Sequence, residues 1–476
     1  MPETRPPTED SRSPIAVSQQ RSAVTLSPFD KIVLSTLLGL ALLTGLIAAL
    51  GNRIGLQVVN IEPADGATDV STRAVLRVKF DQKLAAFNSG FPLSMTPVVS
   101  GTLRWEESTL AFTPAQPLMP DTEYRVTLVA DLQSDQGRPL PNSLTWQFRT
   151  RRPRILYVAA DTQANDQLFV LSGIGAQPVQ LTQEALGIWD YGLSPDGATI
   201  SYAAMRPDGG SDLWQIDSDG SNRKQLVDCT QAACSGAVWS PDGSRMVYEW
   251  RKLLVAGAAP GPPRLWWLNP ATNETVPVFQ DNQWLGYGAR WSPDSQWLSY
   301  ISPSNQGIQV YNVNDGRNFL IPSRMGGLGV WSPRGDALLV SDIQRQEEGF
   351  AVHLLKADPT NGQLVDLSGQ KANVEDSSPV WSPDGGWIAF TRKVAGASMG
   401  KQIWLMRPDG SDAHYLTNET DIHHGLPEWS TDSRYLLYQS YSLKELGAQP
   451  SVWLLDTQTG ESQQVIASGN RPTWLP

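Results

Sequence analysis

One pentapeptide recurs through the C-terminal two-thirds of this 476-residue chain and constrains its fold more than any other feature. Its usual form is Trp-Ser-Pro-Asp-Gly, in which proline fixes φ and glycine permits a positive φ, as a tight turn between strands requires. Successive copies lie 40 to 52 residues apart, the repeat length of a β-propeller blade. The copies begin at Leu193, Trp239, Trp291, Trp331, Trp381 and Trp429, and a truncated copy begins at Trp474.

Each repeat has the sequence pattern of four short strands. An apolar strand precedes the pentapeptide, a second follows it, and a third leads through an Asp/Asn/Gly turn to a fourth. The segment from Ile155 to Thr182 supplies three strands without an inner one, and Arg471–Trp474 supplies an inner strand alone. Joining them closes the ring and removes exposed edges. We therefore expect an all-β propeller of seven blades over residues 154–476, with six blades as the alternative.

These repeats resemble the TolB-like propeller repeat, also known as the WD40-like or PD40 repeat, whose hallmark is Trp-Ser-Pro-Asp-Gly. The chain departs from the hallmark at Arg334, which replaces the aspartate, and at Thr431, which replaces the proline. Propellers of this family occur as docking modules of the cell envelope and as the non-catalytic part of some peptidases. The resemblance therefore implies binding without naming the partner.

A smaller β-domain is expected over residues 56–150. Apolar and polar residues alternate at Val75–Phe80, Thr102–Trp105, Tyr124–Leu128 and Leu144–Arg149, which indicates an immunoglobulin-like β-sandwich. The region resembles the bacterial Ig-like domain of envelope proteins. The matching segments are Ile61–Ala67, Leu110–Pro114, Leu118–Tyr124 and Trp146–Thr150. This resemblance implies an extracytoplasmic spacer or adhesion module.

A membrane anchor is predicted near the N-terminus. The 19 residues from Ile32 to Leu50 carry no charge, and as a helix they would span about 28 Å, close to the hydrocarbon thickness of a bilayer. We expect one transmembrane helix over residues 31–53, with a cleaved signal peptide as the alternative. Residues 1–30 are rich in Pro, Ser and Thr and are expected to form a disordered cytoplasmic tail. The domains after the helix would then lie outside the cytoplasm.

Composition excludes several classes of function. A net charge of −11 argues against a nucleic-acid partner, which would require a basic surface. The chain has only four histidines and two cysteines, so we expect no cofactor and no metal site. Cys229 and Cys234 share one loop and would form a local disulfide in an oxidising compartment.

Propeller geometry locates the candidate site. The Ser-Pro-Asp-Gly turns must emerge at one end of the ring, the turn face. The loops that join the second strand to the third, and the fourth strand to the next inner strand, emerge at the other end, the mouth face. Aromatic and ionisable residues just before the inner strands should surround the central channel there and form a binding surface. They are Trp189, Asp190, Tyr191, Trp284, Tyr287, Arg324, Asp376, His423 and His424.

Catalytic signals are weak. Gly396–Gly400 has the spelling of a hydrolase elbow, but that chemistry needs a strand-to-helix turn, and this copy falls in a blade loop. Adjacent His423 and His424 rarely converge on one metal ion without further ligands. We therefore predict no catalytic residues. The predicted function is a membrane-anchored scaffold whose propeller binds an envelope protein, peptide or glycan. The alternatives are an extracytoplasmic hydrolase or lyase that uses the mouth residues, and a ligand sensor.

Overall fold

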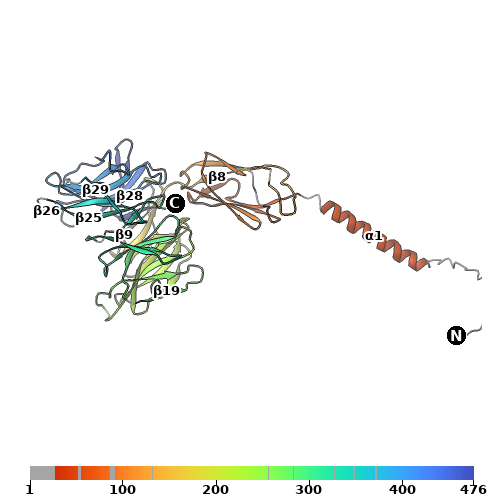
Figure 1. The fold of residues 1–476 in the computed structure, drawn as a ribbon, viewed down its shortest axis with the longest axis horizontal. Coiled ribbons are helices and arrows are strands. Elements are labelled where there is room, and N and C mark those ends of the chain that lie inside the picture. The colour runs from red at the N-terminus through yellow and green to blue at the C-terminus, as the bar shows by residue number, and fades with distance from the viewer. Residues whose placement is uncertain are drawn as a thin grey trace, which may run out of the picture. The chain divides into compact units, whose positions relative to one another are not determined.

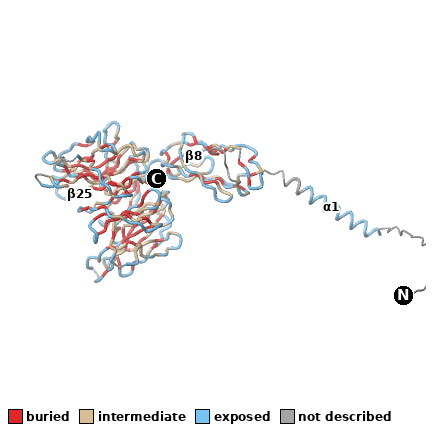
Figure 2. The backbone as a smooth tube through the Cα atoms, in the orientation of Figure 1, coloured by how far each residue is buried: buried red, intermediate tan, exposed pale blue. Residues whose placement is uncertain are grey.

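One helix precedes the β-domains. The structure, a computed structural model, describes residues 27–51, 55–85, 92–130, 132–255, 257–281, 283–325, 327–346, 349–369 and 373–475. Helix α1 spans Pro28–Gly51, and its part from Pro28 to Leu46 is long and apolar enough to cross a membrane. A signal sequence near an N-terminus has the same properties. In Figure 2, the residues of α1 whose burial is described have the colour of exposed residues.

The helix begins earlier than the sequence analysis placed it. Ser27 caps it, because the Asp30 amide donates to the Ser27 Oγ (3.2 Å) and the Ser27 amide donates to the Asp30 carboxylate (3.1 Å). Pro28 occupies the first helical position, where proline is favoured. Residues 28–30, predicted to belong to the tail, are therefore helical. The rest of the predicted tail, up to residue 26, lies outside the described residues.

The Ig-like region consists of two four-stranded sheets. The first contains, in spatial order, β1 (Val58–Glu62), β3 (Leu76–Phe80), β6 (Thr109–Pro114) and β5 (Gly101–Glu106). The second contains β2 (Ala67–Val70), β8 (Leu144–Thr150), β7 (Glu123–Leu128) and β4 (Leu93–Thr96). Alternate residues of β3 and β7 are buried, as the period of two predicts. Only the β2–β8 pair is parallel among the described strand pairs of this region.

The propeller region continues from Arg154 (Figure 1). Its first two groups are β12 (Ile188–Leu193), β13 (Thr199–Met205), β14 (Ser211–Asp217) and β15 (Lys224–Val227), then β16 (Ala232–Trp239), β17 (Met246–Lys252), β18 (Arg264–Leu268) and β19 (Thr275–Pro277). The next two are β20 (Tyr287–Trp291), β21 (Trp297–Ser302), β22 (Gly307–Asn312) and β23 (Asn318–Pro322), then β24 (Val330–Trp331), β25 (Leu338–Gln346), β26 (Gly349–Ala357) and β27 (Leu364–Asp366).

The remaining strands complete the ring. They are β28 (Val374–Trp381), β29 (Ile388–Val394), β30 (Gln402–Met406) and β31 (His414–Tyr415), followed by β32 (Ile422–Trp429), β33 (Tyr435–Ser442), β34 (Ser451–Asp456) and β35 (Ser462–Ile466). One sheet has the order β11-β10-β9-β36, built from β9 (Arg154–Ala160), β10 (Asp166–Leu171), β11 (Val179–Gln180) and β36 (Asn470–Leu475). The C-terminal strand β36 pairs antiparallel with β9, which is the predicted closure.

The pentapeptide turns hold themselves together through a serine and an aspartate. In a typical copy the Ser240 Oγ donates to the Asp242 carboxylate (2.6 Å), which also accepts from the Ser244 amide (3.0 Å). The aspartates therefore serve as turn formers. Where Arg334 replaces the aspartate, Asp336 takes its place and accepts from the Ser332 Oγ at 2.6 Å.

Buried side chains pack between neighbouring sheets of the propeller. One cluster joins residues of β9 and β10 to residues of β12, β13 and β14, and similar clusters recur around the ring. The second strand repeatedly supplies a large, fully buried ring: Tyr202, Tyr248, Tyr300, Phe390 and Tyr438. Figure 2 shows the buried segments along the strands and the exposed segments mainly at the loops. The blades are therefore held mainly by apolar packing.

Candidate functional site

The turn face contacts the Ig-like region. The Ser71 Oγ donates to the Asp196 carbonyl oxygen (2.6 Å), and the Arg73 Nη1 donates to the Pro195 carbonyl oxygen (3.4 Å). On another repeat, the Gln116 Nε2 donates to the Pro383 carbonyl oxygen (3.3 Å). All three acceptors belong to the main chain of Ser-Pro-Asp-Gly turns.

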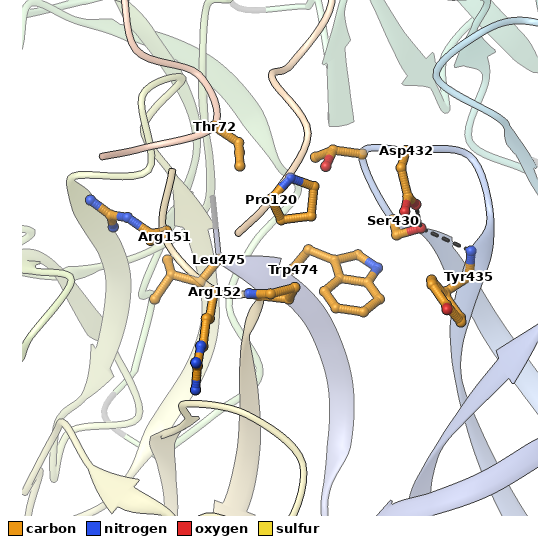
Figure 3. Close-up of a pocket in the computed structure, with 11 residues that line it drawn as sticks. Thr72, Pro120, Arg151, Arg152, Ser430, Asp432, Tyr435, Trp474 and Leu475 are labelled. Carbon is orange, nitrogen blue, oxygen red and sulfur yellow. Dashed lines mark hydrogen bonds between the residues drawn. The ribbon is translucent and has the colours of Figure 1, made fainter. Parts of the chain in front are cut away.

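A small apolar pocket lies at this contact (Figure 3). Its volume is about 80 Å³, and Figure 3 shows Pro120 of the Ig-like region facing the Trp474 ring of β36. Arg151 and Arg152 of the connecting segment and the turn at Ser430 complete the wall. The Ig-like region, the connecting segment and the propeller thus share one packed junction.

Glu428 is a half-buried carboxylate beside the strand that carries Trp474. It lies at the turn end of β32 and accepts hydrogen bonds from the Thr473 hydroxyl and the Trp474 amide (3.2 Å) of the neighbouring strand β36. Burial raises the pKa of Glu428 to about 7, although these hydrogen bonds and the Arg73 guanidinium oppose the rise. Desolvation in turn lowers the pKa of Arg73, opposed by the attraction of Glu428. Arg73 of the Ig-like region therefore places a positive charge within electrostatic reach of Glu428.

At the mouth face, irregular inner strands position the polar groups. The ladder between the first and second strands shifts register two to four residues before the pentapeptide in six of the repeats. The bulged residue has a positive φ at Gly236, Gly288, Ser378, Leu426 and Arg471. In three cases the amide of the bulged residue donates a hydrogen bond to a side chain from a preceding strand. The Gly236 amide donates to Asp190 (2.6 Å), the Gly288 amide to Glu249 (2.9 Å) and the Arg471 amide to Gln439 (3.4 Å).

The predicted residues Trp189, Asp190 and Tyr191 lie together at one side of the mouth, against Arg471. The Arg471 Nη1 donates to the Trp189 carbonyl oxygen (2.5 Å), and the Tyr191 hydroxyl donates to the Arg471 carbonyl oxygen (2.5 Å). Burial raises the pKa of Asp190 to about 6; the Gly236 hydrogen bond lowers it, and nearby Glu249 raises it. Burial also raises the pKa of Tyr191. The Trp189 ring is 61% exposed, so it is free to contact a ligand.

The predicted residues Trp284, Tyr287 and Arg324 belong to later repeats. Trp284 packs on Phe279 with ring centroids 5.0 Å apart, and Tyr287 opens β20. The Arg324 amide donates to the Asp342 carboxylate (2.8 Å), while its side chain borders a polar hollow. Trp284 is therefore partly occupied in packing, whereas Arg324 faces an open site.

The predicted residues Asp376 and His424 are buried, so the structure does not present them to solvent. Arg392 binds both carboxylate oxygens of Asp376 (2.7 Å each), and the Ser368 hydroxyl adds a third hydrogen bond. The His424 Nε2 lies 3.1 Å from the Glu419 carboxylate, and burial lowers the pKa of His424.

Neighbouring His423 points to the other side of β32, as consecutive strand residues do. Its ring stacks on Tyr441, with the ring centroids 4.9 Å apart. Burial, with a contribution from Lys401, lowers the pKa of His423. The two histidines are therefore not arranged as a pair of metal ligands. Over residues 27–475, excluding the gaps named above, no three His, Cys, Asp or Glu side chains converge as a metal site would require.

Cys229 and Cys234 form a disulfide with their Cα atoms 6.2 Å apart. Hydrogen bonds fix the same loop: the Cys229 amide donates to the Asp212 carboxylate (2.9 Å), and Arg206 donates to the Cys229 and Ala232 carbonyl oxygens (3.0 Å each). The loop leads directly into β16 at the mouth face. It is therefore part of a rigid rim.

Comparison with known families identifies the fold. A family model described as the TolB beta propeller domain matches residues 144–411, more than half of the chain. The chain belongs to the TolB beta propeller family. A second model, described as a bacterial Ig-like domain, matches residues 52–150.

Several solved structures are similar to this chain at low sequence identity. A puromycin hydrolase is 15% identical, with a TM-score of 0.51, over 67% of this chain and 52% of that chain. TolB from Acinetobacter baumannii is 15% identical, with a TM-score of 0.43, over 81% of this chain and 84% of that chain. An oligogalacturonate lyase from Vibrio parahaemolyticus is 15% identical, with a TM-score of 0.48, over 66% and 85%. The likeness to the puromycin hydrolase shows the fold alone and leaves the specific function open.

Several charged residues of the Ig-like region and of this TolB-type propeller were missed by the sequence analysis. They are Arg73, Glu249, Arg290, Glu428 and Arg471. A signal existed for Glu249, Arg290 and Glu428, since each is a charged residue directly beside an aromatic residue in an otherwise apolar strand. Burial lowers the pKa of Arg290, against the attraction of Glu249. No local signal could have placed Arg73, because its contacts depend on how two domains dock.

Proposed function

We propose that this protein is a membrane-anchored, extracytoplasmic binding protein whose seven-bladed propeller docks an envelope protein or peptide at its mouth face. The observation that carries the proposal is the contact of the Ig-like region with the Ser-Pro-Asp-Gly turns. Since this contact occupies the turn face, the mouth face is the end of the ring available for a partner. The repeated turns would then contact the Ig-like region, and the variable loops of the mouth face would contact the partner.

The exposed apolar side chains support this choice of face. Exposed apolar side chains that gather on one face of a protein mark an interaction surface. The mouth loops and hairpins of the described chain carry Trp189, Leu254, Phe350, Met399 and Leu446, all of them exposed. These residues would contact the partner, and the polar groups between them would select it.

Export and anchoring rest on three further observations. Helix α1 is apolar and long enough to span a bilayer. Disulfides such as Cys229–Cys234 persist outside the cytoplasm. The bacterial Ig-like model matches directly after the helix. We infer that α1 remains as an anchor with the N-terminus in the cytoplasm.

Site-specific photo-crosslinking in intact cells tests the docking face. A photoreactive residue would replace Trp189 or Tyr287 at the mouth face, and Gln458, an exposed residue of a turn-face loop, is the matched control. We expect the same adduct with one envelope component from both mouth positions and none from Gln458. Adducts from Gln458 alone, or turnover of a small substrate by the purified chain, would overturn the proposal. Protease added to intact cells should also degrade the propeller, and survival of residues 154–476 would contradict the topology.

A further inference from the structure

A polar hollow of about 490 Å³ opens beside the fourth pentapeptide repeat. Gln306 lies in the connection from β21 to β22, and Arg324 follows β23. Ile343–Arg345 lie near the end of β25 that is far from the pentapeptide turn. All three segments belong to the mouth face by the order of the strands. The volume is in the range of ligand sites in proteins, roughly 300–1,000 Å³.

The hollow lies beside an open strand edge. The inner strand β24 has two residues and pairs only with Leu338 and Leu339 of the nine-residue β25. In the next repeat, by contrast, β28 pairs with β29 along its whole length, from Val374 to Trp381. Beyond Leu339, β25 continues as a hairpin with β26, in which Gln346 pairs with Gly349. Among the described residues, the outer end of β25 therefore has no strand partner on its inner side, where the segment that carries Arg324 contacts it through the Asp342 side chain.

The backbone groups at this edge can be assigned from the ladder. The Ser332 amide donates to the Ala337 carbonyl oxygen (2.8 Å), so alternation makes Val330–Leu339 the next hydrogen-bonded pair. The amide and carbonyl groups of Ile343 and Arg345 then face the same side of β25 as those of Leu339. Within the described chain, neither residue has a hydrogen bond on that side. Unpaired groups of this kind are a template for an added strand.

Two arginines give the edge a preference for anions. Arg324 and Arg345 border the hollow, both are exposed, and neither forms an ion pair within the described part of the chain. Asp342 is buried beside them, where its carboxylate accepts from the amides of Arg324 (2.8 Å) and Met325 (3.1 Å). Asp342 thus fixes the segment that carries Arg324. A guanidinium group binds a carboxylate with two parallel hydrogen bonds.

We propose that this hollow binds an extended peptide that adds as a strand to Ile343 and Arg345 of β25 and places its C-terminal carboxylate between Arg324 and Arg345. This inference rests on the proposed function, since it names the ligand class of the mouth face. Main-chain hydrogen bonds would supply sequence-independent binding, and the arginines would select a free carboxyl end.

Binding of peptide pools to the full-length chain in lipid nanodiscs tests the proposal. One pool contains pentapeptides of randomised sequence with free C-terminal carboxylates, the second is amidated, and the third has free carboxylates but N-methylated alternate amides. Bound peptides are quantified by mass spectrometry. We expect the free-acid pool to be retained at least tenfold more than either of the other pools. Arg324→Gln or Arg345→Gln should remove this difference.

Two further variants separate strand addition from simple charge attraction. Ile343→Pro removes an amide that the β-ladder does not use, so the fold should persist while retention of the free-acid pool is lost. Arg317→Gln, on the opposite face of the same part of the ring, is the matched control and should bind as the wild type does. Equal retention of acid and amide, or of methylated and unmethylated peptides, would overturn the proposal, as would no retention at all. If the Trp189 and Tyr287 crosslinks form while the pools fail, the docking face stands and this peptide site is wrong.

Discussion

Replacing Glu428 with glutamine tests whether an ionised carboxylate at this position destabilises the folded protein. Glutamine keeps an oxygen that can accept from Thr473 and the Trp474 amide, but it cannot ionise. Burial raises the pKa of Glu428 from an ordinary 4.5 to about 7. Because the pKa in the folded protein exceeds that in the unfolded chain, the stabilisation is complete below about pH 4.5 and is lost as the pH rises through 7.

The size of the effect follows from this difference in pKa. One pKa unit corresponds to about 1.4 kcal/mol, so full burial would give on the order of 3 kcal/mol. Solvent still reaches part of the Glu428 side chain, and screening therefore reduces the expected effect to about 1–2 kcal/mol. At pH 8 the Glu428→Gln variant should be more stable than the wild type by this amount. At pH 4.5 the two should be equal.

Thermal unfolding of the full chain from pH 4.5 to 8 measures the effect. The expected gain at pH 8 corresponds to roughly 2–4 °C in the midpoint of the propeller transition. Asp190→Asn is the matched control, because burial raises the pKa of Asp190 to about 6, so its effect should be complete at lower pH. Arg73→Gln should make the stability of the folded protein fall more steeply above pH 6, because it removes the attraction between the Arg73 guanidinium and the Glu428 carboxylate. Parallel wild-type and Glu428→Gln profiles between pH 6 and 8 would refute the reasoning.

Three other perturbations have defined outcomes. Replacing Cys229 and Cys234 with serine should destabilise the propeller by about 2 kcal/mol, measured by urea unfolding, since the disulfide closes a short loop; reduction of the wild type should reproduce the loss, and equal stability of the variant would contradict it. Asp376→Asn should lower the free energy of unfolding by about 3–5 kcal/mol, because it leaves Arg392 buried without its charge partner. A loss of ligand binding without a loss of stability would instead make Asp376 a ligand contact. Asp336→Ala should cost about 1 kcal/mol in thermal unfolding, because Asp336 supplies the acceptor in its turn; an unchanged midpoint would show that the turn does not need it.

Much of the fold was predictable because local chemistry specifies it. Proline, glycine and the serine–aspartate pair determine each turn within five residues, and apolar alternation determines the strands beside it. Closure of the ring by β36 and β9 followed from counting unpaired strands. The start of α1 was placed too late, because the prediction relied on hydropathy and did not use the capping sequence Ser27, Pro28 and Asp30.

The candidate site was less predictable because it depends on contacts between distant segments. The sequence placed Asp376 and His424 at the mouth by their distance from the pentapeptide, but it could not show which side of the strand each would occupy. Arg392 lies 16 positions from Asp376, and their pairing becomes evident only once the hairpin forms. The short β24 was also hidden, because Gly329-Val330-Trp331 reads like any other inner strand.

The repeated turns explain how one small domain can contact the turns of more than one repeat. Ser71, Arg73 and Gln116 donate to main-chain carbonyl oxygens of the turns, not to their variable side chains. Such a contact depends on turn geometry, which Ser-Pro-Asp-Gly reproduces from one repeat to the next. We therefore expect substitutions in the mouth loops to leave this docking unchanged. Under the proposed function, the end that binds the partner would vary while the contact with the Ig-like region is kept.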